Sequence, residues 1–241
     1  MTIGIIDSGI GGKGIEKEIK KLLPKVKVLY LGDRKNFPYG TKPARVLNKI
    51  IEDNAQILLA KGARVIVLAC NSGSVTSLQY LRRKIKVPIV GVVPAIKPAA
   101  AATKTKKIAI FATPITTKSV VQENLIKEFC RGIKVYKIPF ANLAGKIEFG
   151  ELAEAKADIS KQWEKYKDKN IDAIVLGCTH YTLIKNAIQK IVGEAVLGVH
   201  VRQESTSGDY SARLAAPDRP AFWAMSWVAD YPSPQDFLGL L

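Results

Sequence analysis

The sequence predicts an α/β fold, with two α/β/α domains, mostly parallel sheets and a cleft between the domains. Short apolar runs alternate with amphipathic stretches, an order typical of parallel sheets covered by helices on both faces. The 241 residues are 47% hydrophobic and 24% charged, which suits one large or two small soluble domains. Two apolar runs far apart in the chain end at Cys70 and Cys178, which indicates two comparable units.

The predicted strands are mostly apolar runs of four to six residues that contain β-branched side chains. Each predicted helix has an apolar face at helical spacing. In chain order the strands are Ile3–Ile6, Val26–Leu31, Val65–Leu68, Pro88–Val92, Ile108–Phe111, Val135–Ile138 and Ala173–Leu176, and the clearest helices are Ile15–Leu23, Arg45–Leu59 and Ser119–Phe129. Two prolines and an alanine run between Val93 and Thr105 predict a boundary between a domain at 1–95 and another at 96–198.

Residues 199–241 differ in composition from the rest of the chain. No lysine follows Lys190, and two of the three tryptophans lie in this segment. We expect an atypical C-terminal segment, packed on the first or the second domain. Its runs Val199–Glu204, Asp209–Leu214 and Ala221–Val228 are compatible with a fused β-α-β unit.

Composition narrows the classes of function. No apolar run approaches the roughly 20 residues that span a bilayer, and the start of the chain reads as a strand rather than a leader, so we expect a cytoplasmic protein. The three cysteines are too few and too widely spaced for a disulfide framework or a zinc site, and the chain has only two histidines, so no metal is predicted. Cys130 closes a predicted helix and is expected to be a small buried residue.

The net charge of +16 raises the possibility of nucleic-acid binding. The basic residues are spread along predicted helices, however, and no basic tract is interleaved with aromatic residues. A lysine-rich solvated surface explains the charge better, and no nucleic-acid partner is expected.

The segments Ala69-Cys70-Asn71-Ser72 and Gly177-Cys178-Thr179-His180-Tyr181 are the most informative motifs. Each places a thiol where a strand ends and a helix begins, next to backbone N–H groups and the positive end of the helix dipole. Such a position predicts a lowered thiol pKa. Ligands of open α/β sheets bind at the carboxyl ends of strands. The two cysteines therefore suggest opposed acid and base groups on either side of one small ligand.

Two further segments contribute polar groups. A strand enters the glycine-rich turn from Asp7 to Gly12, which offers N–H donors and a carboxylate able to orient a nearby thiol. The loop Asn36–Lys42 contains Pro38-Tyr39-Gly40 and predicts either a packed turn or a rim of N–H and hydroxyl donors for a carboxylate.

Together these segments resemble the glutamate racemases, over residue 1 to about residue 195. The matching residues, in the family's order, are Ile6-Asp7-Ser8-Gly9 with Gly11-Gly12, Gly32-Asp33, Pro38-Tyr39-Gly40, Ala69-Cys70-Asn71, Val90-Gly91-Val92, Ala112-Thr113 with Thr116 and Ser119, Glu148 with Gly150, and Gly177-Cys178-Thr179-His180-Tyr181. The proline-tyrosine-glycine loop favours glutamate over aspartate racemases.

The resemblance implies a cofactor-independent racemase that supplies D-glutamate for peptidoglycan and commonly forms homodimers. It implies that Cys70 and Cys178 exchange protons with the substrate, assisted by Asp7 and His180 respectively. The substrate-binding residues that it implies are Asp7, Ser8, Pro38, Tyr39, Gly40, Asn71, Ser72, Thr113, Thr116, Thr179 and His180.

The chain departs from the family pattern at Ser72 and Thr182, where the family usually has threonine and proline, and we expect little effect from either. The larger departure is the C-terminal segment, of which residues 227–238 resemble a stretch of the peptide-binding proteins of ABC transporters. Two alternatives therefore stand beside glutamate racemisation. One is a racemase for aspartate or another acidic amino acid, and the other is a catalytically silent chimera.

Overall fold

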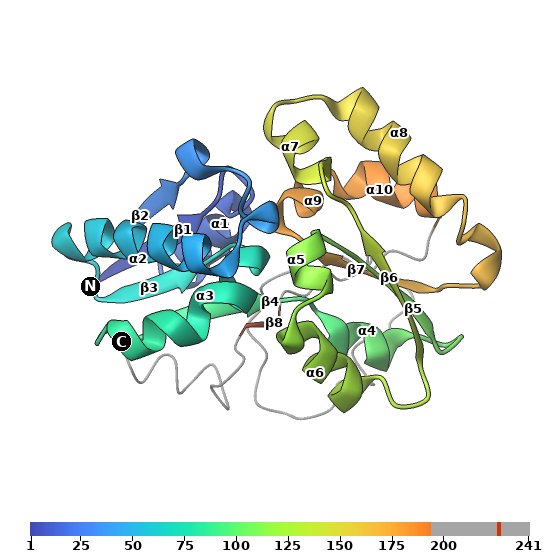
Figure 1. Cartoon of the computed structure of the whole chain (residues 1–241), viewed down its shortest axis with the longest axis horizontal. Coiled ribbons are helices and arrows are strands. Elements are labelled where there is room, and N and C mark those ends of the chain that lie inside the picture. The colour runs from blue at the N-terminus through green and yellow to red at the C-terminus, as the bar shows by residue number, and fades with distance from the viewer. Residues whose placement is uncertain (194–225, 228–241) are drawn as a thin grey trace.

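The computed structural model describes residues 1–193 and, within the C-terminal segment, the backbone of residues 226–227. It contains two sheets (Figure 1), one in the order β2-β1-β3-β4-β8 and the other in the order β6-β5-β7. Every strand pair is parallel except β4 with β8, the short strand Ser226–Trp227. The predicted α/β class and the mostly parallel sheets are confirmed.

The first sheet and its helices take up the N-terminal half of the described chain. In order they are β1 (Thr2–Asp7), α1 (Lys13–Leu22), β2 (Lys27–Gly32), the 3-10 turns η1 (Arg34–Asn36) and η2 (Tyr39–Thr41), α2 (Ala44–Ala60), β3 (Val65–Leu68), α3 (Asn71–Lys84) and β4 (Ile89–Val93). The central strand β1 pairs Ile6 with Leu68 of β3. Because parallel strands end at the same edge, this register brings Asp7 and the residues after Leu68 to one edge of the sheet.

The second sheet follows through α4 (Ile96–Ala102). Its elements are β5 (Lys107–Ala112), α5 (Pro114–Thr117), α6 (Val120–Phe129), β6 (Lys134–Pro139), α7 (Leu143–Glu148), α8 (Leu152–Trp163), η3 (Lys167–Lys169), β7 (Ala173–Gly177), α9 (Thr179–Leu183) and α10 (Lys185–Val192). Ala112 of β5 pairs with Gly177 of β7, so Thr113 and Cys178 follow adjacent strand ends.

Three clusters of buried side chains form the core. One packs on the first sheet beneath α2 and α3, and a second packs on the second sheet beneath α7, α8 and α10. The third is shared, because it joins residues of β1 and β3 to residues of β5 and β7. Ala95 and Ile96, at the passage from β4 to α4, lie within this third cluster. The two sheets are therefore joined by a continuous apolar core as well as by the chain.

Most of the C-terminal segment lies outside the described residues, and so do the predicted runs Val199–Glu204 and Asp209–Leu214. Of the predicted strand Ala221–Val228, residues 226–227 are described. They add an antiparallel strand beside β4, with Trp227 opposite Val92. Within residues 1–193, no helix is long and apolar enough to cross a membrane, and no cluster of potential ligand side chains is arranged to hold a metal ion.

Ser74 links β3, β4 and α3, and its replacement by alanine is expected to destabilise the fold by about 1–3 kcal/mol. Its hydroxyl donates to the Leu68 carbonyl at 2.9 Å and accepts from the Val92 N–H at 3.0 Å. Without it, two buried backbone groups lose a partner. Urea unfolding at constant m-value measures the loss.

Ser77, one turn further along α3, provides the matched control. Its side chain is fully buried, and its hydroxyl has no hydrogen-bond partner among the described residues. Ser77→Ala should therefore be neutral or slightly stabilising, because it removes an unsatisfied polar group. Equal losses in the two variants would contradict the assignment of the Ser74 bonds.

Candidate active site between the two sheets

The two predicted cysteines occupy equivalent positions. Cys70 is the residue before α3 and follows β3, while Cys178 is the residue before α9 and follows β7. Both are in extended backbone conformations, both are free thiols, and each is 7% exposed. The third cysteine, Cys130, is buried at the end of α6 within the shared core cluster, as predicted.

Hydrogen bonds between predicted site residues connect the two sheets. Thr179, in the second unit, donates its hydroxyl to Asp7 of β1 at 3.1 Å. The hydroxyl of Ser72 in α3 lies 2.8 Å from that of Thr113 and 3.4 Å from that of Thr116. All four hydroxyl-bearing side chains are buried. The structure therefore gathers residues from four segments that are widely separated in the sequence.

The predicted lowering of the thiol pKa values is wrong. Burial, together with the nearby charge of Asp7, raises the pKa of Cys70 to about 12, against the opposing effect of the Gly73 and Ser72 N–H groups. The predicted helix N-terminus is present, but its N–H groups stabilise the thiolate by less than the loss of water destabilises it.

Cys178 has the same environment with one addition. Burial is the main reason that its pKa lies well above the ordinary value, and the charge of Cys70 is the second reason. The N–H groups of His180 and Tyr181 act in the opposite direction. Ionisation of one thiol therefore disfavours ionisation of the other, so the pair does not hold two thiolates at once.

Asp7 is completely buried at the end of β1. One carboxylate oxygen accepts the Gly9 N–H at 2.9 Å, and the other accepts the Thr179 hydroxyl. Burial raises the pKa of Asp7, and the charge of His180 and these hydrogen bonds oppose the increase. Asp7 therefore interacts electrostatically with both the Cys70 thiol and the His180 ring, from a position fixed by the glycine-rich turn.

His180 is buried, and its Nε2 lies 2.8 Å from Glu148 Oε2 in α7. The same oxygen accepts the Ile10 N–H at 2.9 Å, while the other accepts from Arg34 Nε at 2.6 Å. In the sequence, Glu148 matches the family pattern together with Gly150, but the match assigns it no role. Glu148 and His180 belong to separate motifs 32 residues apart, and only the tertiary structure shows that the two side chains meet.

The contacts of Tyr39 bear on the two alternatives predicted for its loop. The Tyr39 hydroxyl donates to Asp33 at 2.7 Å and accepts from Asn54 at 3.0 Å, both within the first unit. Its only proton is thus donated to Asp33, which favours the packed turn over a hydroxyl donor at this residue. Gly40 packs directly against Thr113, since a Cβ at Gly40 would lie 2.8 Å from the Thr113 Cβ. Asp33 matches the family only as part of the Gly32-Asp33 pair, without a role, and the sequence carries no signal for Asn54; both support the position of Tyr39.

Ser8 and Asn71, two more of the predicted substrate-binding residues, have polar groups near Cys70. The Cys70 thiol lies 3.9 Å from the Ser8 hydroxyl, to which it donates. Asn71 is buried, and its Oδ1 has no donor among the described residues. This oxygen is therefore available to accept a hydrogen bond from a ligand. Pro38 is half-buried in the same loop as Tyr39 and Gly40.

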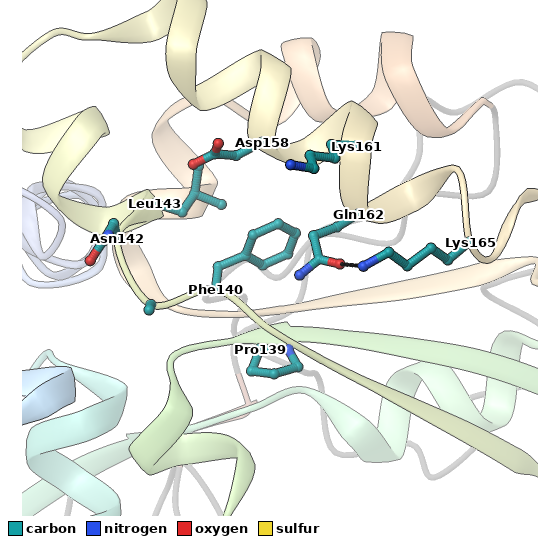
Figure 2. A pocket seen from close by; sticks show the side chains of 9 residues that line it. Pro139, Phe140, Asn142, Leu143, Asp158, Lys161, Gln162 and Lys165 are labelled. Atoms are coloured by element: carbon teal, nitrogen blue, oxygen red, sulfur yellow. Dashed lines mark hydrogen bonds between the residues drawn. The ribbon is translucent and has the colours of Figure 1, made fainter.

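A separate cavity of about 270 Å³ lies where the end of β6 and the start of α7 face α8 (Figure 2). The labelled lining residues are Pro139, Phe140, Asn142, Leu143, Asp158, Lys161, Gln162 and Lys165. It includes none of the predicted site residues. Its link to the thiol site is indirect, through the Phe140 carbonyl, which accepts from the Tyr181 hydroxyl at 3.2 Å.

The raised thiol pKa values predict a loss of stability in alkali. The neutral thiol is favoured in the folded chain, so this contribution is fully present below the ordinary thiol pKa, about 8.5, and is lost as the pH rises toward the folded value. Between these limits each thiol should reduce the free energy of unfolding by about 1.4 kcal/mol per pH unit. Urea unfolding from pH 8.5 to 10 tests this prediction. The free energy of unfolding should fall with pH more steeply in the native chain than in Cys70→Ser, by about 1.4 kcal/mol per pH unit. An equal pH dependence in the two proteins would contradict the prediction.

Comparisons with known proteins agree with this arrangement. The sequence pattern of the Asp/Glu/hydantoin racemase family matches residues 13–201. A glutamate racemase from Clostridium botulinum is 34% identical over 197 residues, which cover 80% of this chain and 76% of the relative. One from Pseudomonas paraeruginosa is 33% identical over 233 residues, covering 92% of this chain and 87% of the relative, so that alignment extends into the C-terminal segment.

Among solved structures, Escherichia coli glutamate racemase in complex with L-glutamate and the activator UDP-MurNAc-Ala superposes with a TM-score of 0.74. It is 29% identical in sequence, and the match covers 95% of this chain and 86% of that chain. The fold similarity thus extends over both sheets and the site between them.

Proposed function

Because the chain belongs to the Asp/Glu/hydantoin racemase family, we propose that it interconverts L- and D-glutamate by proton transfer through Cys70 and Cys178. The observation that carries this proposal is the pair of buried thiols at equivalent strand ends, close enough for the charge of one to affect the other. Such a pair can supply one base and one acid at the same time.

In the proposed reaction one thiolate removes the Cα proton on one face of the amino acid, and the C–H electron pair remains on the substrate. The opposite thiol then delivers its proton to the other face. The base ends as a thiol and the acid as a thiolate, so the two cysteines exchange states in each turnover. No cofactor is required for this sequence of proton transfers.

Neighbouring charged and titratable groups assist the proton transfers of the two cysteines. Asp7 assists Cys70, which it contacts electrostatically, and His180 assists Cys178, which precedes it by two residues. The positive ammonium group of an amino acid opposes the effect of burial on both thiols, so substrate binding favours the thiolate. The free enzyme therefore holds its thiols in the unreactive neutral form until a substrate is present.

Substrate binding is assigned to the buried polar groups around the thiols. The hydroxyls of Ser72, Thr113 and Thr116 form a cluster suited to a carboxylate, and the Asn71 Oδ1 suits the ammonium group. The remaining assigned groups are Asp7, Ser8, Thr179, His180 and the backbone of Pro38, Tyr39 and Gly40.

The proposal includes several wider features. Residues 1–95 and 96–198 act as the two domains that enclose the substrate, and the D-glutamate serves peptidoglycan synthesis in the cytoplasm. The enzyme acts as a homodimer, which light scattering of the purified chain tests directly. The likeness of residues 227–238 to an ABC-transporter protein belongs to a segment that lies largely outside the described residues.

Circular dichroism of glutamate and aspartate solutions tests the activity. Each L-amino acid is incubated with the whole chain and its optical signal is followed. Loss of the glutamate signal toward zero, with little change for aspartate, is expected. Preferential loss of the aspartate signal would favour the aspartate alternative, and glutamate binding without turnover would favour the silent chimera.

A further inference from the structure

Arg34 reaches from the first unit to the carboxylate that holds His180. It lies in η1, between β2 and the Tyr39 loop, and its Nε donates to Glu148 Oε1 at 2.6 Å. The Arg34 side chain is 63% exposed, whereas the Glu148 side chain is fully buried. The guanidinium therefore connects a buried carboxylate to the solvent-facing rim of the site.

The two oxygens of Glu148 have different partners. Oε2 accepts the Ile10 N–H and bonds the His180 ring, so it serves the turn after β1 and the helix after Cys178. Oε1 has Arg34 as its hydrogen-bond partner. The turn fits closely around the carboxylate, because a Cβ at Gly9 would lie 2.3 Å from Oε2. Arg34 thus binds the oxygen that the turn and the histidine leave free.

We propose that Arg34 is a positioning residue for the reaction: by binding Glu148 Oε1, it fixes the carboxylate that in turn fixes the His180 ring beside Cys178. The inference rests on the proposed function, because the orientation of His180 matters only if it assists proton transfer at Cys178. It adds a residue of the first unit to the group that controls the thiol of the second unit.

The effect of the Arg34 charge on Glu148 supports a positioning role for Arg34. Burial acts to raise the pKa of Glu148, yet the Ile10 N–H, His180 and Arg34 outweigh it, and the pKa lies below the ordinary value. The other charged or titratable groups that interact with this cluster are Asp7 of β1, through His180, and Tyr30 of β2. Neither is a cation, and among the described residues Arg34 is the lysine or arginine that pairs with Glu148.

The substitution Arg34→Ala tests the proposal. We expect kcat to fall about tenfold while KM changes by less than about twofold, because the carboxylate is misplaced but the substrate groups remain. The pKa of Glu148 should rise once the cation is removed. The ionised carboxylate is then lost at a higher pH, so the acid limb of the kcat profile should move to higher pH. Arg34→Lys keeps the charge and should restore part of kcat.

Lys35→Ala is the matched control, since Lys35 is an exposed neighbouring cation with no hydrogen bond or ion pair to Glu148. It removes the same charge from the same turn and should leave kcat and the pH profile unchanged. Arg34→Ala with the kinetics of Lys35→Ala would overturn the proposal. A uniform rise in KM with unchanged kcat would overturn it too, because that result indicates substrate binding by Arg34.

A measurement without turnover separates this inference from the proposed function. The side-chain carboxyl carbon of Glu148, observed by NMR in the whole chain, should titrate at higher pH in Arg34→Ala than in the native chain or Lys35→Ala. If the native chain fails to racemise glutamate, the proposed function fails, and this titration still decides whether Arg34 controls Glu148. An unchanged titration would overturn the inference even if the native chain is active.

Discussion

Replacing either Cys70 or Cys178 with serine is expected to reduce glutamate racemisation by about a thousandfold or more. A serine hydroxyl has nearly the shape of a thiol, so substrate binding should survive. Its proton is far less acidic, however, and the loss of an acid or base positioned at the reacting carbon costs about 10²–10⁴ in rate. Circular dichroism of L- and D-glutamate, followed in both directions, measures the effect.

The third cysteine gives the control for this experiment. Cys130 is also buried, but it closes α6 and packs in the shared core cluster rather than at a strand end. Cys130→Ser should keep the specific activity of the folded protein. If Cys70→Ser or Cys178→Ser behaved as Cys130→Ser does, the two-thiol mechanism would be excluded.

Isotope exchange in D₂O extends the test to the number of bases. With two separate bases, the deuterium delivered by the second thiol appears first in the product enantiomer. A single base that returns protons to both faces would place deuterium in substrate and product alike. Early deuterium in the recovered substrate would therefore contradict the assignment of opposite faces to Cys70 and Cys178.

The strands and the edge on which the site lies were predictable because they depend on local sequence. Runs such as Val65–Leu68 are β-branched and buried, and the observed β3 has these same bounds. Parallel register then follows from the alternation of strands and helices, and it brings Asp7, Cys70 and Cys178 to the carboxyl edges. Residues that directly follow a strand could thus be assigned to one site from the sequence.

Contacts between side chains of distant segments were not predictable in the same way. The meeting of Glu148 with His180, and of Arg34 with Glu148, depends on how α7 packs against the turn after β1. The thiol pKa values also depend on tertiary burial, which outweighs the local helix N-terminus at Cys70. The sequence indicated that the loop Asn36–Lys42 carries a hydroxyl group at Tyr39. In the fold this hydroxyl donates to Asp33 of the same unit.

A methyl group at Gly11 should abolish most of the activity while leaving the fold intact. A Cβ there would lie 2.5 Å from the Thr179 hydroxyl, 2.6 Å from His180 Nδ1 and 2.9 Å from the His180 backbone nitrogen. Backbone cannot move aside cheaply, so the turn and α9 must separate. Displacements of about 1 Å in an active site can cost 10²-fold in rate. We expect Gly11→Ala to reduce kcat/KM by about a hundredfold.

Gly14→Ala makes the same chemical change three residues later and provides the comparison. A Cβ at Gly14 meets nothing within 4 Å, and the residue lies in the first turn of α1. Alanine there should leave activity unchanged and stabilise the helix by about 0.5–1 kcal/mol. Thermal unfolding of both variants separates damage to the site from damage to the fold.

The comparison also tests whether the two sheets must approach each other for catalysis. Thr179 of α9 donates to Asp7 in the first unit. Glu148, which bonds the His180 ring, accepts the Ile10 N–H of the glycine-rich turn, so both links between α9 and the first unit pass beside Gly11. If Gly11→Ala retained full activity, the reacting enzyme would need neither contact, and Asp7 and His180 would have to act from separated units. A loss confined to Gly11→Ala instead indicates that the thiols work only when α9 is seated against the glycine-rich turn.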